Sequence, residues 1–400
     1  MSRFVIYSPL VYSLHVFQNT SQEYKVSSWP SLIRWCDFIT EHTLLPNLQR
    51  LIVDSCSNTN LVKWTFLLLM PSLIEIRLLT VSETNPPWIP ESDASTLLAH
   101  VAKLCPSLQT LAILAQPDND NEDEDDIGLG ILPCLSEFTS YEYIANMNCL
   151  RDLSIGKYFL ETESFVSIGL LPALETLFVH ESCKETELAI FHNQLPDFLF
   201  PSLRHLTLHL IDSCEIARIW QIDSLVKNLI HANIEAVPPD SEYRQEEGKY
   251  GLIDWLPDLF QNSLHIQHLS AGFKVYGYTE IQTLESSSLS TILQLPLQHL
   301  SLPMIEIVDF EEFCQLFSES CPGLRRLDIP HTEVGFSVLP HITEYFMRLE
   351  HLSVNISWDV DDIPELSQLG QPQTSLRSLE YSTYEYADPD DDLTANSTIM

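Results

Sequence analysis

Glycine, basic side chains and the motifs of common catalytic sites are scarce in this 400-residue chain. The 11 glycines form no Gly-rich phosphate loop, and neither a G-x-S-x-G nor an H-E-x-x-H motif occurs. The 14 histidines stand at no spacing to Cys, Asp or Glu that is typical of a metal site. We therefore predict that the chain is not an enzyme and holds no cofactor and no metal ion.

Basic residues are outnumbered: 20 Lys and Arg stand against 56 Asp and Glu, which gives a formal net charge of -36. A field of that sign repels nucleic acid, so we expect no DNA or RNA partner. Much of the charge lies in one acidic run at 118–126 and another at 388–392. The first run lacks the D-x-D-x-D-G spacing of a calcium loop, so we predict a solvated loop insertion at 118–126, and an acidic, disordered tail at 388–400.

Long apolar segments are also missing. The apolar run at the N-terminus is interrupted by Pro9 and His15 and is followed by no small-residue cleavage site, so no signal peptide is expected. A second run, at 64–79, contains Pro71 and two charged residues, so no segment is expected to span a membrane. The nine cysteines include no CxxC pair, which favours a reduced, cytoplasmic or nuclear protein.

What the chain does contain is a short phrase, apolar-x-x-apolar-x-apolar, repeated along its length. Clear copies begin at Leu48, Leu73, Leu108, Leu174, Leu203, Leu324 and Leu349, and weaker copies at Val11, Leu135, Leu150, Ile266, Leu297 and Leu376. The copies from Leu297 onward start 25 to 27 residues apart, which is the period of a leucine-rich repeat. A further, degenerate copy at 229–234 is equally compatible with a helix.

The alternation within each copy predicts a strand with one buried face, and the segments between copies are predicted to be helical. One helix is expected after a capping box at 309–312, with Phe310, Phe313, Cys314 and Phe317 on one face. A second is expected to be capped by Ser92, with Leu97, Leu98, Val101, Leu104 and Cys105 on one face, and Leu188, Phe191 and Leu195 indicate a third. We predict an α/β fold, a leucine-rich-repeat solenoid (horseshoe) over 1–387, with a parallel sheet on the concave side and helices on the convex side. Cys105 and Cys321, each before a proline, are expected to be buried at helix ends.

Histidine recurs at one position of the phrase in the C-terminal half. The residue before the second apolar position should point away from the core, because its neighbour points into it. This position holds His205, His268, His299, Arg326 and His351, joined by His231 if 229–234 is a strand. Flanking positions on the same face hold Arg204, Thr207, His209, Arg325 and Asp328. Such a partly cationic row suits an acidic or phosphorylated segment of a partner, although repeat duplication alone would also copy a histidine.

Several segments carry a family resemblance. The stretch Phe4–Leu14, followed by Trp29–Leu32 and Leu44–Leu51, together with the Cys-Pro-x-Leu-x-x-Leu copies at 105 and 321, resembles the repeat region of fungal F-box and leucine-rich-repeat proteins. The resemblance implies the substrate-recognition half of a cullin ubiquitin-ligase receptor, in which the repeats hold a protein substrate on the concave face and an F-box binds a small adaptor. The F-box itself has no counterpart here, so the ligase adaptor is expected as a partner only if an upstream F-box exists.

Two other interpretations stay open. The acidic charge also fits a solenoid similar to ribonuclease inhibitor, which would bind and block a cationic protein. A repeat fold without a defined partner is the third. At the N-terminus we expect Val11, Leu14 and Val16 to be buried as an incomplete first repeat, covered by a helix at 32–39, so that the chain alone should not bind the adaptor.

Overall fold

The computed structural model describes residues 6–16, 44–54, 58–79, 88–116, 143–160, 162–181, 195–237, 252–273, 281–289, 294–335, 338–357 and 375–382. The predicted insertion at 118–126, the tail at 388–400, the helix at 32–39 and the copy at Leu135 lie outside the described residues. The chain divides into two compact units, Met1–Leu203 and Arg204–Met400, and each is described by itself. The single solenoid over 1–387 therefore stays a prediction.

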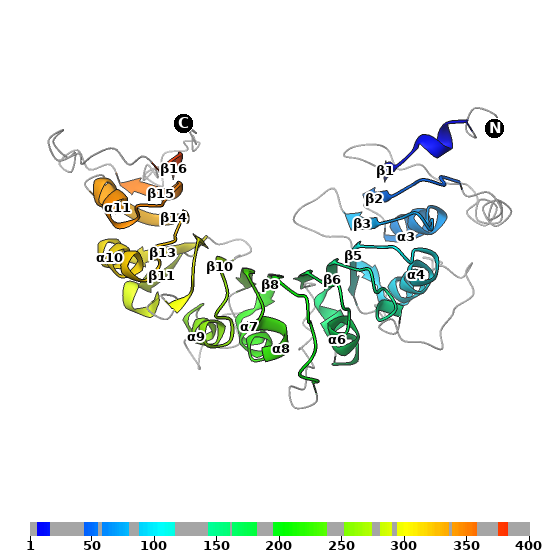
Figure 1. The fold of residues 1–400 in the computed structure, drawn as a ribbon, viewed down its shortest axis with the longest axis horizontal. Helices are drawn as coiled ribbons and strands as arrows, with labels where there is room; N and C mark the ends of the chain where they lie inside the picture. Colours follow the sequence, from blue (N-terminus) through cyan, green and yellow to red (C-terminus); the bar gives the residue numbers. More distant parts are fainter. Residues whose placement is uncertain are drawn as a thin grey trace, which may run out of the picture. The chain divides into compact units, whose positions relative to one another are not determined.

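Unit 1 is built on a parallel sheet with helices on one of its faces (Figure 1). The strands follow one another in chain order: β1 (Ser13–Val16), β2 (Arg50–Asp54), β3 (Glu75–Leu79), β5 (Thr110–Gln116), β6 (Asp152–Gly156) and β7 (Thr176–His180). A short strand, β4 (Trp88–Pro90), pairs with the end of β5. The helical elements are η1 (Ser8–Leu10), α3 (Asn58–Leu67), α4 (Glu91–Leu104), η2 (Lys157–Leu160) and α6 (Thr162–Gly169).

Unit 2 repeats this plan. Its parallel strands are β8 (His205–Asp212), β9 (His231–Val237), β10 (His268–Phe273), β12 (His299–Ser301), β14 (Arg326–Gly335), β15 (His351–Ser357) and β16 (Ser378–Ser382). A separate parallel pair is formed by β11 (Gln282–Glu285) and β13 (Ile305–Val308). The helical elements are α7 (Ser213–Trp220), α8 (Asp223–Val226), α9 (Leu252–Asn262), η4 (Ser286–Leu289), α10 (Phe310–Ser320) and α11 (Leu339–Tyr345).

Each repeat enters its strand through the same pair of backbone hydrogen bonds. The Arg204 carbonyl accepts from the N–H groups of Ile230 (2.9 Å) and His231 (3.0 Å), and the Ile230 carbonyl accepts in turn from Gln267 (2.9 Å) and His268 (3.1 Å). The pattern recurs at every later repeat of unit 2 and at the repeats of unit 1. Because one carbonyl accepts hydrogen bonds from two consecutive N–H groups of the next repeat, the strand register is fixed. Residues at the same position of neighbouring repeats therefore lie side by side.

The predicted fold class is confirmed in both units. Phrase copies in the described residues lead into strands, and the segment at 229–234, left open between helix and strand, leads into β9. First-position residues form the core, with Leu48, Leu73, Leu150, Leu203, Leu229 and Leu349 all 0% exposed. A parallel strand followed by a helix at the leucine-rich-repeat period makes each unit an α/β solenoid.

The two Cys-Pro turns end helices as expected. Cys105 follows α4 and Cys321 follows α10, and both side chains are buried. Each thiol donates to a carbonyl of the preceding repeat, Met70 (3.4 Å) and Leu295 (3.6 Å). Burial raises the pKa of Cys105 to about 12 and that of Cys321 to about 11, so both stay protonated structural thiols.

Three details differ from the sequence-based expectation. Helix α4 begins at Glu91 with Pro90 as its N-cap, so Ser92 lies inside the first turn and does not cap it. The capping box at 309–312 is wrong, because Asp309 adopts a left-handed backbone (φ 59°) from which its side chain caps no N–H group. Val11, Leu14 and Val16 are half-buried rather than buried, since β1 pairs only with β2 among the described strands. None of the described helices is long and apolar enough to span a membrane.

Candidate functional site

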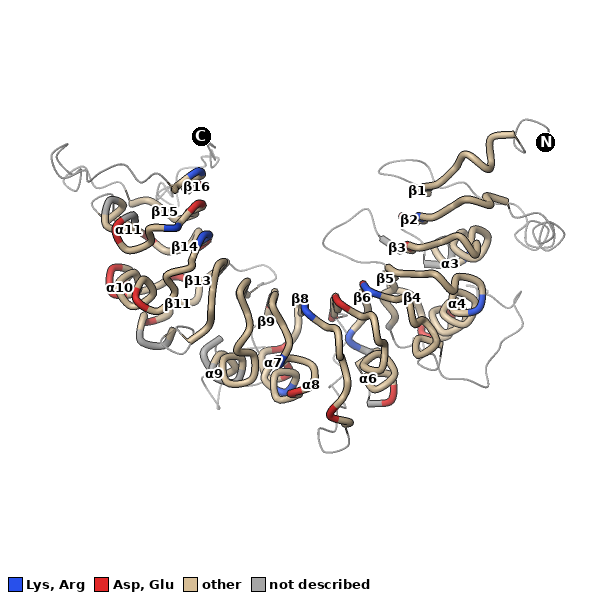
Figure 2. The backbone as a smooth tube through the Cα atoms, viewed as in Figure 1, with Lys and Arg blue, Asp and Glu red and all other residues tan. Residues whose placement is uncertain are grey.

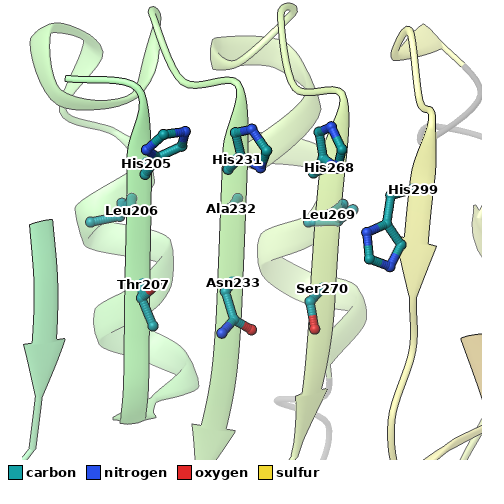
Figure 3. Close-up of a pocket in the computed structure, with 10 residues that line it drawn as sticks. All are labelled: His205, Leu206, Thr207, His231, Ala232, Asn233, His268, Leu269, Ser270 and His299. Atoms are coloured by element: carbon teal, nitrogen blue, oxygen red, sulfur yellow. The ribbon is translucent and has the colours of Figure 1, made fainter. Parts of the chain in front are cut away.

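The strand register of unit 2 brings the predicted site residues into one row. His205 pairs with His231, His231 with His268, and His268 with His299 across strands β8, β9, β10 and β12. The row continues through Arg326 in β14 and His351 in β15. We call these six residues, His205, His231, His268, His299, Arg326 and His351, the ladder. All five predicted members lie in it, and His231 joins them because 229–234 leads into a strand (Figure 3).

Strand geometry turns the ladder outward. The residue that follows each ladder position points into the core, and Leu206, Leu269 and Leu300 are at most 1% exposed. Side chains alternate between the two faces of a strand, so the ladder lies on the face opposite the core. Arg326 is exposed and the five histidines are half-buried. We call this side of unit 2 the ladder face.

Imidazole rings of neighbouring repeats contact one another. The ring centroids of His205 and His231 lie 4.3 Å apart at 71°, those of His231 and His268 4.1 Å apart at 15°, and those of His268 and His299 5.7 Å apart at 81°. The middle pair is thus stacked, and the outer pairs meet edge to face (Figure 3). This continuous aromatic surface follows directly from placing one histidine on each adjacent strand.

These contacts oppose protonation of the inner rings. Burial, together with the charges that His268, His205 and His299 would carry, lowers the pKa of His231 to about 4. Burial also lowers the pKa of His268, together with His299 and His205. Like charges on adjacent strands repel, so the inner rungs are neutral near pH 7.

Asp328 balances the charge at the other end of the ladder. Its Oδ2 atom lies 2.6 Å from Arg326 Nε and 3.2 Å from His299 Nε2. Although burial raises the pKa of Asp328, the hydrogen bonds and charges of His299 and Arg326 outweigh it and lower the pKa overall. Asp328 is therefore ionised at neutral pH, and the one guanidinium of the ladder is already paired. The ladder is less cationic than its composition suggests.

A trough of short polar side chains runs beside the ladder. Thr207, Asn233, Ser270 and Ser301 occupy one register, two residues further along each strand, and we call these four residues the trough. Thr207, Asn233 and Ser270 line a shallow depression of about 190 Å³ together with the first four ladder histidines, His205, His231, His268 and His299 (Figure 3). Asp328 continues the same register beyond Ser301.

The remaining predicted flanking residues are held by neighbours. His209 Nε2 lies 2.6 Å from Glu235 Oε2, which closes the far side of the trough. Arg204 donates from Nη1 to the Asn228 carbonyl at 3.0 Å. Arg325 lies 3.4 Å from a carboxylate oxygen of Glu350 and Arg377 lies 3.5 Å from the other, so basic residues gather where β14 and β16 begin (Figure 2).

Sequence reasoning missed Asn233, Ser270, Ser301 and Glu235 as parts of this face. The available signal was the phrase itself, because the position two residues after each ladder histidine must point to the same side. For Asn233 and Glu235 this signal is ambiguous, because the sequence at 229–234 is equally compatible with a helix and with a strand. Among the described residues, no group of three His, Cys, Asp or Glu side chains is placed to hold a metal ion.

Comparisons with known proteins give a structural similarity but no matching family or curated relative. No protein-family model matches the chain, and no curated protein matches it. Among solved structures, it is similar to an internalin (InlF) from Listeria monocytogenes, with 15% sequence identity and a TM-score of 0.37, over 94% of this chain and 88% of that one. These values describe a distant similarity. The fold assignment accordingly rests on the strand register and the repeated hydrogen bonds.

Proposed function

We propose that the chain is a non-catalytic protein-interaction module and that the ladder face binds its partner. The observation that supports this is the register itself, which aligns six outward side chains on adjacent strands beside a polar trough. Solenoids present such sheet faces as extended binding surfaces. The contacting imidazole rings offer a partner apolar contact area, and the polar side chains of the trough offer hydrogen bonds that give specificity. Such a surface can bind a protein without a deep pocket.

The finer role we propose first is that of a substrate-recognition region similar to the repeats of an F-box ubiquitin-ligase receptor. In this role the ladder face holds the protein substrate, and the ligase adaptor is bound only through an upstream F-box. Calorimetric titration with purified adaptor tests whether adaptor binding requires an upstream F-box. We expect no measurable binding by residues 1–400, and micromolar or tighter binding would contradict it.

The second candidate is an acidic solenoid that binds and blocks a cationic protein, as ribonuclease inhibitor does. One observation favours it: the inner imidazoles are neutral near pH 7 and Arg326 is paired with Asp328, while the chain carries a net charge of -36. A surface of that kind attracts a basic partner more than an acidic one.

Site-specific photo-crosslinking tests the proposal common to both roles. Benzoylphenylalanine at Asn233 places the probe in the trough, and the same probe at Ser154 occupies the matching register of unit 1. We expect a defined crosslinked protein from native extract with the probe at Asn233 and none with the probe at Ser154. The product should disappear when H231A/H268A is added. A product that survives that double change, or one that forms equally at Ser154, would place the binding surface elsewhere.

A further inference from the structure

The ladder face offers a cation three complementary features. The contacting imidazoles of His205, His231 and His268 form one wall of the trough. The Glu235 carboxylate stands on the other side, and Asp328 lies in line with the trough beyond Ser301. Neutral aromatic faces attract guanidinium groups, and carboxylates accept their hydrogen bonds.

In the described part of the chain, strands near the inner rungs carry charged and titratable side chains in addition to the ladder histidines. On β8 these are Arg204, whose guanidinium is bonded to a carbonyl, and His209; on β9 the group is Glu235; on β14 they are Arg326 and Asp328. The two arginines are engaged, and His209 lies against Glu235. Burial and the neighbouring imidazoles hold the pKa of His231 and that of His268 below the usual range. An anion would be attracted only by protonated imidazoles, and the lowered pKa values of His231 and His268 disfavour that form. A cation can bind the neutral imidazoles that are already present.

We infer that the ladder face takes an extended, arginine-bearing segment of the partner protein, with a guanidinium stacked on the imidazoles, and that protons compete with this segment for the face. The inference rests on the proposed function, since it names the chemistry of the partner. Arginine is favoured over lysine because its planar guanidinium stacks on rings and pairs with carboxylates through two parallel hydrogen bonds.

The trough sets the length of the segment. It crosses four strands, and strands about 4.8 Å apart give it a span of roughly 14 Å. An extended chain rises about 3.3 Å per residue, so about four residues lie along it. The overall charge of -36 increases the encounter rate with a basic segment.

Peptide titrations at two pH values test the inference. The probe is a labelled six-residue peptide with two arginines among glycine and serine, compared with its lysine, glutamate and phosphoserine counterparts at about 0.15 M salt. We expect the arginine peptide to bind best at about pH 7.5 and about tenfold more weakly at about pH 4, where protonation of His231 places positive charge in the ladder. The lysine peptide reports the bulk attraction of an acidic protein, and the arginine peptide should exceed it severalfold.

Variants locate the effect. H268R places a permanent positive charge in the ladder, so affinity for the arginine peptide should fall about tenfold at pH 7.5 and become insensitive to pH. S13R, at the matching register of unit 1, adds the same charge elsewhere and is expected to leave affinity within about twofold. H268Q, which removes the ring without adding charge, should give an intermediate loss, and it serves if H268R alters the melting curve.

Three results would overturn the inference. Equal affinity of the arginine and lysine peptides would reduce the effect to bulk charge. Unchanged affinity in both H268R and H268Q would remove the ladder from the site. Tighter binding of the glutamate or phosphoserine peptide, rising on acidification, would assign the face to an acidic partner. In each case a crosslink from the probe at Asn233 would still support the proposed protein-interaction function. If that crosslink were absent too, both the proposed function and this inference would be wrong.

Discussion

At the register that carries the ladder in unit 2, unit 1 carries Ser13, Arg50, Glu75, Thr110, Asp152 and Thr176. In unit 1, neighbours complement one another: Arg50 Nε lies 2.6 Å from Glu75, and Thr110 donates to Asp152 at 3.1 Å. In unit 2, four consecutive neighbours are imidazoles of the same kind. One fold thus builds a row of complementary neighbours and another in which four rings of the same kind pack against one another. The difference lies in the side chains alone, because the backbone pattern is the same.

The contrast extends to titration. Although burial raises the pKa of Glu75, the hydrogen bonds and charges of Arg50 and Arg77 outweigh it and lower the pKa. Ionisation of that group is therefore favoured by its neighbours. In the ladder, burial and the neighbours together oppose ionisation of His231. The two rows respond to acid over different pH ranges, and this offers ways to test the comparison.

The largest expected effect comes from two equivalent glycines. Gly156 in β6 and Gly272 in β10 stand four residues after the row position, and an added Cβ would lie 2.5 Å from the Ala115 carbonyl oxygen or 2.4 Å from that of Pro303. Backbone atoms cannot yield as a flexible side chain can, so G156A and G272A should each cost about 1–3 kcal/mol of unfolding free energy. Urea denaturation measures the loss for each variant.

The same pair of variants separates the two rows. G272A should also weaken the crosslink from the probe at Asn233, because it displaces the strand that carries His268. G156A should leave that crosslink intact. Equal loss of crosslinking in both variants would show that the ladder face depends on unit 1 and that its binding is not a property of the row.

Much of this architecture could be predicted from the sequence, because strand position and register follow from the repeat period and from alternation. Five of the six ladder residues could be predicted for that reason, because each of them is followed by a leucine. The ambiguity at 229–234 arose because Ala232 stands where other copies carry a large apolar residue. The pairing of Arg326 with Asp328 could not be predicted, since it depends on the rotamers of two side chains on the same strand, β14. Strands β4 and β11 escaped prediction because neither contains the phrase.

The second prediction concerns acid stability. His231 binds a proton more weakly in the folded chain than in the unfolded chain, so its contribution is complete above about pH 6.5 and is lost as the pH falls towards about 4. Glu75, whose pKa is lowered, contributes above its unfolded value near 4.5 and loses this contribution only as the pH falls through its folded pKa. Because His231 is half-buried and the arginines that pair with Glu75 are exposed, each effect should be on the order of 1 kcal/mol.

Urea midpoints measured from pH 7.5 down to 4 distinguish the two rows. H231Q should flatten the decline between about pH 6.5 and 4.5, whereas E75Q should change the curve below about 4.5 and lower stability above it. If H231Q left the decline between pH 6.5 and 4.5 unchanged, the imidazole contacts would not oppose protonation in solution.

The smallest expected effect on stability comes from exchanging the chemistry of the rows. H231R/H268E gives β9 and β10 the arrangement that Arg50 and Glu75 have on β2 and β3, with no change in net charge at neutral pH. A complementary pair on adjacent strands contributes about 0.2–1 kcal/mol, so unit 2 should be equally stable or slightly more so. Its row would then satisfy itself, and the crosslink from the probe at Asn233 should be lost although the fold is kept. R50H/E75H is the matched control: it breaks a pair in unit 1, should cost about 1 kcal/mol, and should leave the crosslink unchanged. Retained crosslinking in H231R/H268E, with an unaltered melting curve, would mean that repeat duplication alone placed the histidines there and that the partner binds other side chains.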